Sequence, residues 1–285
     1  MSGKVTVIRA GALTTVQDLG RGGHAHLGVP RSGALDEGAL RLGNRLVGNP
    51  EDAAVLETTL TGCALRPDRG ATFVVGGAPC PVTVDGAPAA WGVPVYVPAG
   101  ATLDVGAVGA GVRSYVAVAG GVAVEAVLGS RSTDLLSGLG PAPLSTGDVL
   151  PVGDAPGTRP ATPVAAPWPA PPAELVLPVR FGPRADWFTE AARRTFVTAT
   201  YTVSGNSNRI GLRTEGPALE RASDGELPSE GMVLGAVQVP PDGRPVVFLH
   251  DHPTTGGYPV IAVVDEAALG AAAQAAPGTR VRFTG

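Results

Sequence analysis

The stretch of residues 233–264 reads VLGAVQVPPDGRPVVFLHDHPTTGGYPVIAVV. Its three valine-rich runs, 233–239, 246–249 and 260–264, alternate with segments of glycine, proline and aspartate. Short β-branched runs between such breakers are typical of β-strands joined by tight turns. This stretch therefore predicts closely spaced strands in a barrel or a sandwich.

The same pattern continues on both sides of this stretch. Glycine (41 residues) and proline (28 residues) are each about twice as frequent as usual, which indicates many turns. Helical patterns are few, and we expect helices only at 36–47, with Asp36 as N-cap, at 186–196, with Asp186 as N-cap, and at 266–276. The further predicted strands are 5–8, 72–75, 93–97, 113–118, 197–203 and 280–283. The sequence thus predicts a mainly β protein with a few short helices.

Residues 151–178 divide the chain. This stretch, PVGDAPGTRPATPVAAPWPAPPAELVLP, is dense in proline and alanine and has no hydrophobic periodicity, which is typical of an extended linker. We therefore predict an N-terminal lobe at 1–150 and a C-terminal lobe at 179–285. A weak internal echo, TGCAL at 61–65 and EGPAL at 215–219, favours two similar lobes.

Composition excludes several classes of protein. A net charge of −4 without a basic stripe argues against nucleic-acid binding. No apolar run approaches the roughly 20 residues that span a bilayer, and the N-terminus lacks a signal-peptide pattern. Cys63 and Cys80 form neither a metal-binding spacing nor a disulfide framework. We expect a cytoplasmic protein with reduced thiols and no metal site.

Lys4 is the only lysine of the chain. A P-loop needs a lysine after its glycine-rich turn, and Schiff-base chemistry also needs one. Biotin, too, is carried on a lysine side chain. Lys4 stands at the beginning of the chain, away from any such motif. This chain by itself is therefore predicted to be neither a P-loop kinase nor a biotin carrier.

Three polar, glycine-rich segments stand out as candidates for chemistry, because glycines let backbone N–H groups approach a ligand. They are 14–36, containing TTVQDLGR and GVPRSGALD; 203–215, containing SGNSNRIGLRTE; and 227–259, containing LPSEG and TTGGYP. Each has a plainer interpretation, in which aspartate, serine and asparagine satisfy their own turns. The histidines form two His-x-His pairs, at 24–26 and 250–252, for which lining a site is favoured over metal binding.

Taken together, these motifs resemble the allophanate hydrolase subunit 2-like proteins, also described as the biotin-dependent carboxyltransferase family. The resemblance rests on TTVQDLGR, GVPRSGALD, GNRLVGNPEDAAVLETTLTG, NSNRIGLRTEGPAL, SEGMVLGAVQVPPDG and TTGGYP. It implies two cyclophilin-like β-barrel lobes. The family includes the C subunit of ATP-dependent 5-oxoprolinases, which works with the A and B subunits of those enzymes. It also includes the domain of urea carboxylase that transfers a carboxyl group from biotin to urea.

Both activities act on an unreactive amide. A site for either needs an acceptor near the amide N–H, a donor near the carbonyl oxygen, and fixed positive charge for an anion. The candidate acceptors are Asp18, Asp36, Glu215 and Glu230; the candidate donors and lining residues are Ser32, Asn206, Ser207, Gln238, Thr254, Thr255, Gly257 and Tyr258; the candidate anion ligands are Arg21 and Arg209.

The resemblance favours the C subunit of a 5-oxoprolinase, which cleaves 5-oxo-L-proline to L-glutamate in a complex. Its cofactor would be ATP with Mg, shared with a partner protein. Two alternatives stay open. One is a biotin-dependent carboxyltransferase acting on urea or a related amide, with biotin on another chain. The other is a non-catalytic regulator of a sensor kinase, acting through a partner that resembles the B subunit.

Overall fold

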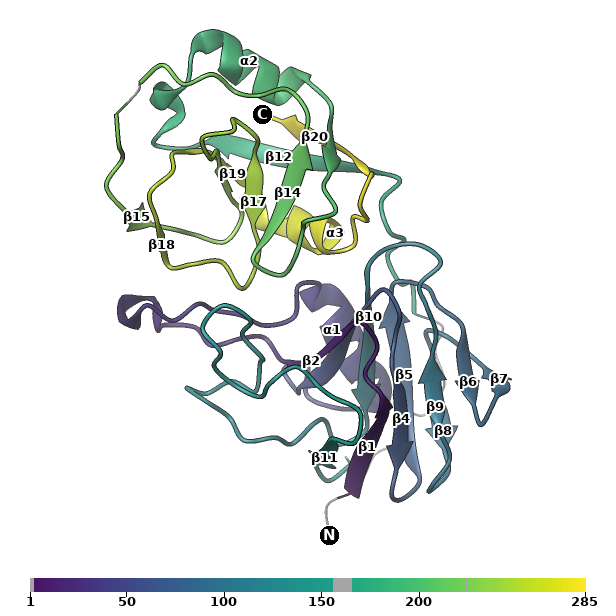
Figure 1. The fold of residues 1–285 in the computed structure, drawn as a ribbon. Helices are drawn as coiled ribbons and strands as arrows, with labels where there is room; N and C mark the ends of the chain where they lie inside the picture. Colours follow the sequence, from purple (N-terminus) through teal and green to yellow (C-terminus); the bar gives the residue numbers. More distant parts are fainter. Residues whose placement is uncertain (1–2, 156–165, 224) are drawn as a thin grey trace. The chain divides into compact units, whose positions relative to one another are not determined.

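The computed structural model describes residues 3–155, 166–223 and 225–285 (Figure 1). Strands predominate and the helices are short, so the predicted mainly β class is confirmed. The chain forms two compact units, which interleave along the sequence. The first unit is 1–21, 36–134 and 138–171, and the second is 22–35, 135–137 and 172–285. Among the described residues, no helix is long and apolar enough to cross a membrane.

The first unit contains two β-sheets. One has six strands in the order β11-β1-β4-β9-β6-β7, and the other has five in the order β2-β3-β10-β5-β8. The strands of the first sheet are β1 (Gly3–Arg9), β4 (Ala64–Pro67), β6 (Val82–Val84), β7 (Ala87–Ala89), β9 (Leu103–Val105) and β11 (Val149–Val152). Those of the second are β2 (Leu13–Gln17), β3 (Val55–Thr59), β5 (Ala71–Gly77), β8 (Val95–Val97) and β10 (Arg113–Val118).

An apolar core of this unit draws on both sheets. Val5 of β1 and Leu103 of β9 meet Leu56 of β3 and Val116 of β10 in it. Because side chains alternate across a strand, the neighbours of Leu56 and Val116 face away from this core. Those neighbours are Glu57 and Tyr115. The second face of the five-stranded sheet therefore carries buried polar groups.

Helix α1 (Glu37–Val47) packs against β5 and β10. Its predicted N-cap is confirmed, because the Asp36 side chain accepts a hydrogen bond from the Ala39 backbone N–H at 3.0 Å. Gly48 ends the helix in the left-handed conformation, where glycine carries no steric penalty. These end signals explain why the sequence located this helix well.

The second unit is a closed barrel of seven strands in the order β12-β19-β16-β17-β14-β13-β20. All its strand pairs are antiparallel except β12 with β20, which is parallel. The strands are β12 (Glu174–Phe181), β13 (Tyr201–Val203), β14 (Gly211–Glu215), β16 (Ala236–Gln238), β17 (Val246–Phe248), β19 (Val260–Val264) and β20 (Arg280–Thr284). A separate two-stranded sheet pairs β15 (Glu230–Gly231) with β18 (Thr255–Gly256).

Aromatic side chains pack against one another in the barrel core. The rings of Phe196 and Phe283 stack with centroids 4.4 Å apart, and Tyr201 meets Phe283 edge-on at 5.6 Å. Phe196 belongs to α2 (Glu190–Thr198), which packs against β20. Leu35 lies in the same core, so the segment 22–35 is part of this unit although it precedes most of the first one.

Three local predictions in this unit differ from the structure. The helix predicted at 186–196 begins only at Glu190, and its N-cap is Thr189, whose hydroxyl accepts the Ala192 N–H at 3.1 Å. Asp186 lies instead in a 3-10 turn, Ala185–Trp187. The strand predicted at 197–203 begins at Tyr201, because α2 continues to Thr198. The helix predicted at 266–276 consists of a 3-10 turn, Glu266–Ala268, followed by α3 (Leu269–Ala273). A third short 3-10 turn, Ala25–Leu27, precedes α1.

The stretch 151–178 includes ordered elements at both ends. β11 ends at Val152 and β12 begins at Glu174, while residues 156–165 lie outside the described residues. Trp168 anchors the part between them. Its indole N–H donates to the Gly92 carbonyl at 2.9 Å, and its ring lies 5.8 Å from that of Trp91. This part of the stretch is thus packed against the first unit.

Candidate active site

Asp18 binds a serine-rich loop of the first unit. One carboxylate oxygen accepts the hydroxyls of Ser130 and Ser132, both at 2.6 Å, and the Gly20 N–H at 2.8 Å. The other oxygen accepts the Arg131 N–H at 2.6 Å. Asp18 is also buried. This carboxylate already has four donors, so the geometry describes a residue that fixes the loop 130–132.

Arg21, a predicted anion ligand, is buried in the same region. Its guanidinium donates to the Ser132 carbonyl and, at 3.4 Å, to the Val127 carbonyl. A terminal nitrogen lies 3.9 Å from a carboxylate oxygen of Asp134, with both side chains fully inaccessible to solvent. Since a buried charge must be paired, Asp134 and these carbonyls account for the position of Arg21.

The side-chain oxygen of Gln17 is a hydrogen-bond acceptor that receives no hydrogen bond from the described residues. Its side-chain N–H₂ group donates to the Thr15 hydroxyl at 3.0 Å and to the Thr133 carbonyl at 3.1 Å. The carbonyl of Thr133 cannot donate, which fixes which end of the Gln17 amide carries the hydrogens. The opposite oxygen is buried and has no partner among the described residues. An unpaired buried acceptor is costly and calls for an explanation.

A buried acid–phenol pair lies on the polar face of the five-stranded sheet. The Tyr115 hydroxyl donates to Glu57 at 2.8 Å and accepts the Asp36 backbone N–H at 2.8 Å. The Arg113 guanidinium lies 3.6 Å from the second Glu57 oxygen. Burial, and then the Glu57 charge, hold the pKa of Tyr115 well above its usual range. This phenol is therefore a fixed hydrogen-bond donor.

Sequence reasoning gave no role to Glu57, Arg113 or Tyr115. The available signal was a charged residue at the centre of VLETT, a run rich in β-branched residues. A glutamate in such a strand must have a partner when it is buried. The side chain of Asp36, predicted as an acceptor near the amide, caps α1. The backbone N–H of Asp36 donates to the Tyr115 hydroxyl.

In the second unit, Asp251 joins three parts of the chain. Arg209 binds it through two nitrogens, at 2.9 and 3.0 Å, and the Ser32 hydroxyl donates to it at 2.9 Å. The Leu135 N–H approaches it at 3.3 Å, and Arg209 also donates to the Gly33 carbonyl at 2.6 Å. Ser32 adopts a positive φ of 54°, which is uncommon for a residue with a side chain.

The structure therefore brings Ser32 and Arg209 together, with Asp251 between them. Arg209 and Asp251 are almost completely buried, at 1% and 0% exposure. Such a two-pronged arginine–carboxylate pair is strong and specific in geometry. Asp251 was not predicted as a site residue, although it stands between the two histidines of the second His-x-His pair.

The β13–β14 hairpin uses its own polar groups. The Asn208 side chain accepts the backbone N–H groups of Ile210 and Gly211, at 2.8 and 3.2 Å. The Ser207 hydroxyl accepts the Arg213 N–H at 3.0 Å. Asn206 lies exposed in the same turn, and Glu215 accepts the Ser204 hydroxyl at 2.8 Å. The plainer interpretation, an Asx turn, describes this segment.

Another group of predicted residues gathers around the β15–β18 pair. Glu230 is ion-paired with Arg184, whose hydrogen bond lowers the pKa of Glu230. Gln238 donates to the Tyr258 carbonyl at 3.1 Å, and the Arg221 guanidinium lies 6.0 Å from the centre of the Tyr258 ring. Thr254, Thr255 and Gly257 lie in the same segment, with Thr255 paired to Gly231.

The histidines differ in their surroundings. His252 is buried, stacks on Phe248 with ring centres 5.7 Å apart, and bonds the Pro253 carbonyl through Nδ1 at 2.8 Å. Burial lowers its pKa. His26 is exposed and His24 half-buried. Among the described ranges, no three His, Cys, Asp or Glu side chains group as metal ligands.

Comparison with known proteins places the chain in a family. Residues 27–285 match the family model described as carboxyltransferase domain, subdomain A and B. The chain is 39% identical to the C subunit of 5-oxoprolinase from Escherichia coli, covering 97% of this chain and 89% of that protein. It is 33% identical to urea amidolyase of Saccharomyces cerevisiae, covering 98% of this chain and 16% of that protein.

Solved structures agree with this placement. The crystal structure of a protein named TTHA0988 superposes with a TM-score of 0.90 at 37% identity, covering 99% of this chain. The chain spans about half of that protein, 55%. K. lactis urea amidolyase also gives a TM-score of 0.90, at 33% identity, with 98% of this chain and 18% of that one covered. By family model, sequence and fold, the chain belongs to the carboxyltransferase domain family, subdomains A and B.

Proposed function

We propose that this chain acts as the C subunit of an ATP-dependent 5-oxoprolinase, together with partners that resemble the A and B subunits of that enzyme. The observation that carries the proposal is its 39% identity to a 5-oxoprolinase C subunit over 89% of that protein's length. The corresponding protein of Haemophilus influenzae is 33% identical over 90% of its length. The matched regions of the urea enzymes are only 16% to 24% of those proteins.

The chemical difficulty in this reaction is the stability of the lactam amide. Phosphoryl transfer from ATP to the amide oxygen would make its carbon open to water, and hydrolysis would yield glutamate, ADP and phosphate. The anion ligands predicted on this chain do not fit a triphosphate, because Arg21 and Arg209 are buried against Asp134 and Asp251. We propose that ATP and Mg are bound by the partner proteins.

Gln17 is the residue that we assign to the amide. The carboxylates of Asp18 and Asp36 already accept hydrogen bonds within the protein. The Glu230 carboxylate is already ion-paired with Arg184. By contrast, the Gln17 side-chain oxygen has no partner in the described part of the chain. A neutral acceptor of this kind would bind the lactam N–H and orient the amide without adding charge.

The test is to assemble the chain with its A-like and B-like partners and to measure glutamate formed from 5-oxo-L-proline and ATP. Gln17→Leu should raise KM about tenfold or more, because the lost hydrogen bond acts in substrate binding. Gln274→Leu, which changes another buried glutamine, is the matched control and should retain the wild-type KM. Turnover that needs no partner protein, or equal KM values for the two variants, would overturn this proposal.

A second candidate is a biotin-dependent carboxyltransferase, favoured by the TM-score of 0.90 with K. lactis urea amidolyase. Avidin distinguishes the two activities, since it should stop carboxyl transfer from a biotin carrier and leave lactam cleavage intact. Activity only with a biotin carrier and an amide would support this second candidate. Partner binding without turnover of any substrate would instead support the regulatory alternative.

A further inference from the structure

Arg221 is anchored where the end of β16 meets the segment that follows β18. Its guanidinium donates to the carbonyl of Val239, the residue after β16, at 2.8 Å. The Val239 N–H in turn donates to the Pro259 carbonyl at 3.0 Å. The backbone of Arg221 is also fixed, because it forms a β-bridge with Phe188. The position of this guanidinium is therefore set by the barrel and not by a surface side chain.

Tyr258 forms a wall beside Arg221. The centre of its ring lies 6.0 Å from the Arg221 guanidinium, which is a cation–π distance. The Tyr258 carbonyl accepts the side-chain N–H of Gln238, a buried residue, at 3.1 Å. A Cβ on Gly256 would lie 2.9 Å from that Gln238 nitrogen, so glycine there leaves room for the amide. The Tyr258 backbone is thus held from below, while its side chain is 45% exposed.

The charge of Arg221 is not matched by a carboxylate. In the parts of the chain that the structure describes, this half-buried side chain makes one hydrogen bond, to a neutral carbonyl, and no ion pair. The acid of β15, Glu230, is already paired with Arg184. A guanidinium has five N–H donors, so donors of Arg221 remain for a ligand. A partly buried cation without a counter-charge attracts an anion.

Other arginines of the second unit lack this combination of features. Arg184 and Arg282 have acidic partners, Glu230 and Glu174. Arg244 makes no ion pair with any described residue, but its side chain is exposed and is not anchored by a hydrogen bond. Arg221 therefore joins an unmatched charge to a fixed position, and Arg244 is its natural control.

We propose that Arg221 and Tyr258 form a binding site for a small aromatic monocarboxylate. The guanidinium would donate two parallel N–H groups to the carboxylate. The flat body of the ligand would pack against the exposed part of the Tyr258 ring. All contacts of this site lie within the second unit, and the inference does not rest on the proposed lactam reaction.

The charge and the ring together set the ligand class. The single positive charge of Arg221 is balanced by a monoanion, whereas a phosphate dianion needs a second cation, and Arg184 is bound to Glu230. A neutral amide of the same shape would leave the guanidinium without a counter-charge. An acid as small as acetate would leave the Tyr258 ring uncovered. An aromatic monocarboxylate meets both requirements.

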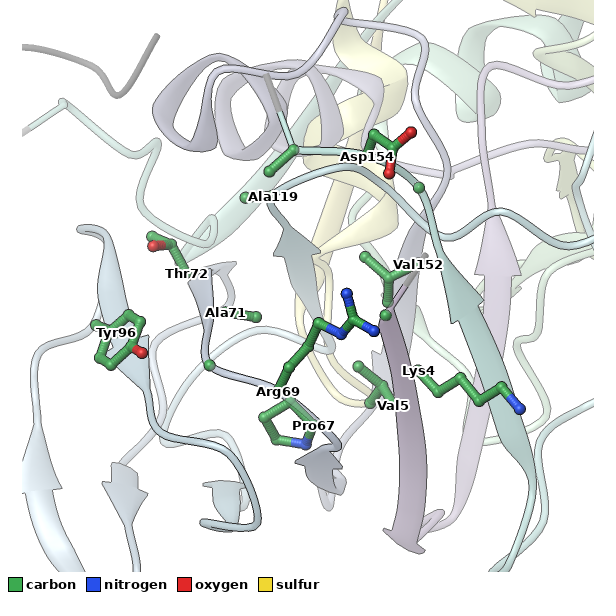
Figure 2. A pocket seen from close by; sticks show the side chains of 14 residues that line it. Lys4, Val5, Pro67, Arg69, Ala71, Thr72, Tyr96, Ala119, Val152 and Asp154 are labelled. Carbon is green, nitrogen blue, oxygen red and sulfur yellow. The ribbon is translucent and has the colours of Figure 1, made fainter. Parts of the chain in front are cut away.

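A cavity of about 290 Å³ in the first unit serves as the comparison site (Figure 2). Lys4 and Arg69 line it together with Asp154, and Tyr96 of β8 contributes an aromatic ring. The Asp154 carboxylate repels an anion, because like charges placed together cost free energy. We therefore expect an aromatic monocarboxylate to bind at Arg221 in preference to this cavity.

The experiment is an NMR titration of the full, isotope-labelled chain with benzoate, benzamide, acetate and inorganic phosphate as separate probes. We expect benzoate to bind with a Kd on the order of 1 mM and to shift the N–H signals of Gly257 and Tyr258 most. Benzamide, acetate and phosphate should each bind at least about fivefold more weakly than benzoate. The N–H signals of Thr72 and Tyr96, in the comparison cavity, should stay in place.

Three variants assign the contacts, and a fourth is the control. Arg221→Gln should weaken benzoate binding about tenfold. Arg221→Lys keeps the charge without the paired donors, so it should recover only part of the affinity. Tyr258→Leu should weaken benzoate and leave acetate unchanged. Arg244→Gln, which removes an exposed and unanchored arginine, should bind benzoate like the wild type.

Several outcomes would overturn the proposal. They are the absence of benzoate binding, benzamide or phosphate binding as tightly as benzoate, signal shifts centred on Thr72 and Tyr96, and equal weakening by Arg221→Gln and Arg244→Gln. The comparison of benzoate with benzamide uses the wild-type chain, so it decides the question even where a variant fails to fold. Because no partner protein is present, a negative titration leaves the proposed lactam cleavage untouched. An inactive complex, equally, would not affect binding at Arg221.

Discussion

The Asp251 carboxylate accepts hydrogen bonds from three separate segments of the second unit. Arg209, Ser32 and the Leu135 backbone all donate to it, and water is excluded from the arginine–carboxylate pair. Burying such a pair brings little net stability compared with apolar residues. Removing one partner, however, leaves an uncompensated buried charge, which is strongly destabilising.

Arg209→Met should therefore lower the free energy of unfolding by about 3 to 5 kcal/mol, as measured by urea denaturation. Arg280→Met serves as the control, because Arg280 is mostly exposed and lies 3.9 Å from Glu174. That control should leave the unfolding midpoint unchanged. A similar loss of unfolding free energy in the two variants would show that the buried Arg209–Asp251 pair has no special role in stability.

Cys63 makes stability depend on pH. Complete burial raises the pKa of its thiol from 9.0 to about 12. In the unfolded chain the thiol loses its proton near pH 9, whereas in the folded chain it keeps it. The stabilising contribution is therefore full below pH 9 and is lost as the pH rises toward 12.

We expect the free energy of unfolding to fall across this window, with a contribution from Cys63 of up to about 1.4 kcal/mol per pH unit. Cys63→Ala should remove that contribution, so its stability profile should be flatter above pH 9. Tyr115 and Tyr201 remain in both proteins and cancel in the comparison. Parallel profiles from pH 9 to 11 would contradict the role of Cys63.

At the scale of elements, glycine at position 76 lets a tryptophan pack on a strand. A Cβ on Gly76 would lie 2.0 Å from the Trp168 ring, and Trp168 attaches the segment before β12 to the first unit. Gly76→Ala should displace the indole, cost about 1 to 3 kcal/mol of stability and shift the tryptophan fluorescence. Gly109→Ala, where a Cβ meets nothing, is the control. Unchanged fluorescence in Gly76→Ala would refute the contact.

Element prediction succeeded where the signals were local. The helix at 36–47 carries its own cap and its left-handed glycine, so its limits follow from the sequence. The limits of α2 were misplaced, because Asp186 and Thr189 are both good caps and tertiary packing decides between them. Strands β2, β3 and β14 were not predicted, since polar residues such as Gln17 and Glu57 interrupt their apolar pattern.

At the scale of the whole molecule, the units interleave along the chain. Residues 22–35 belong with 172–285, where Ser32 contacts Asp251 and Leu35 lies in the barrel core. A fragment of residues 172–285 alone lacks these groups. It should melt at a lower temperature and less cooperatively than a fragment that also carries 22–35 through a flexible linker, as measured by circular dichroism. Identical melting of the two fragments would show that this segment is dispensable.

The sequence by itself determined the mainly β class, the position of α1 and, through its motifs, the family. These depend on short-range patterns, namely strand periodicity, glycine and proline breakers, helix caps and motifs such as TTGGYP. The single lysine, Lys4, also argues from the sequence alone against a P-loop kinase and a biotin carrier. The roles of individual polar residues did not follow, because the partner of a side chain is set by contacts between distant segments.

Only the tertiary structure decided which charged side chains are already paired within the protein. It pairs Arg209 with Asp251 and Arg21 with Asp134, so two residues that looked like anion ligands are held within their own units. It also brings Glu57 to Tyr115 and leaves the Gln17 oxygen without a partner in the described chain. The physical reason is that a buried charge or dipole must be compensated nearby, and only the fold determines what lies near it.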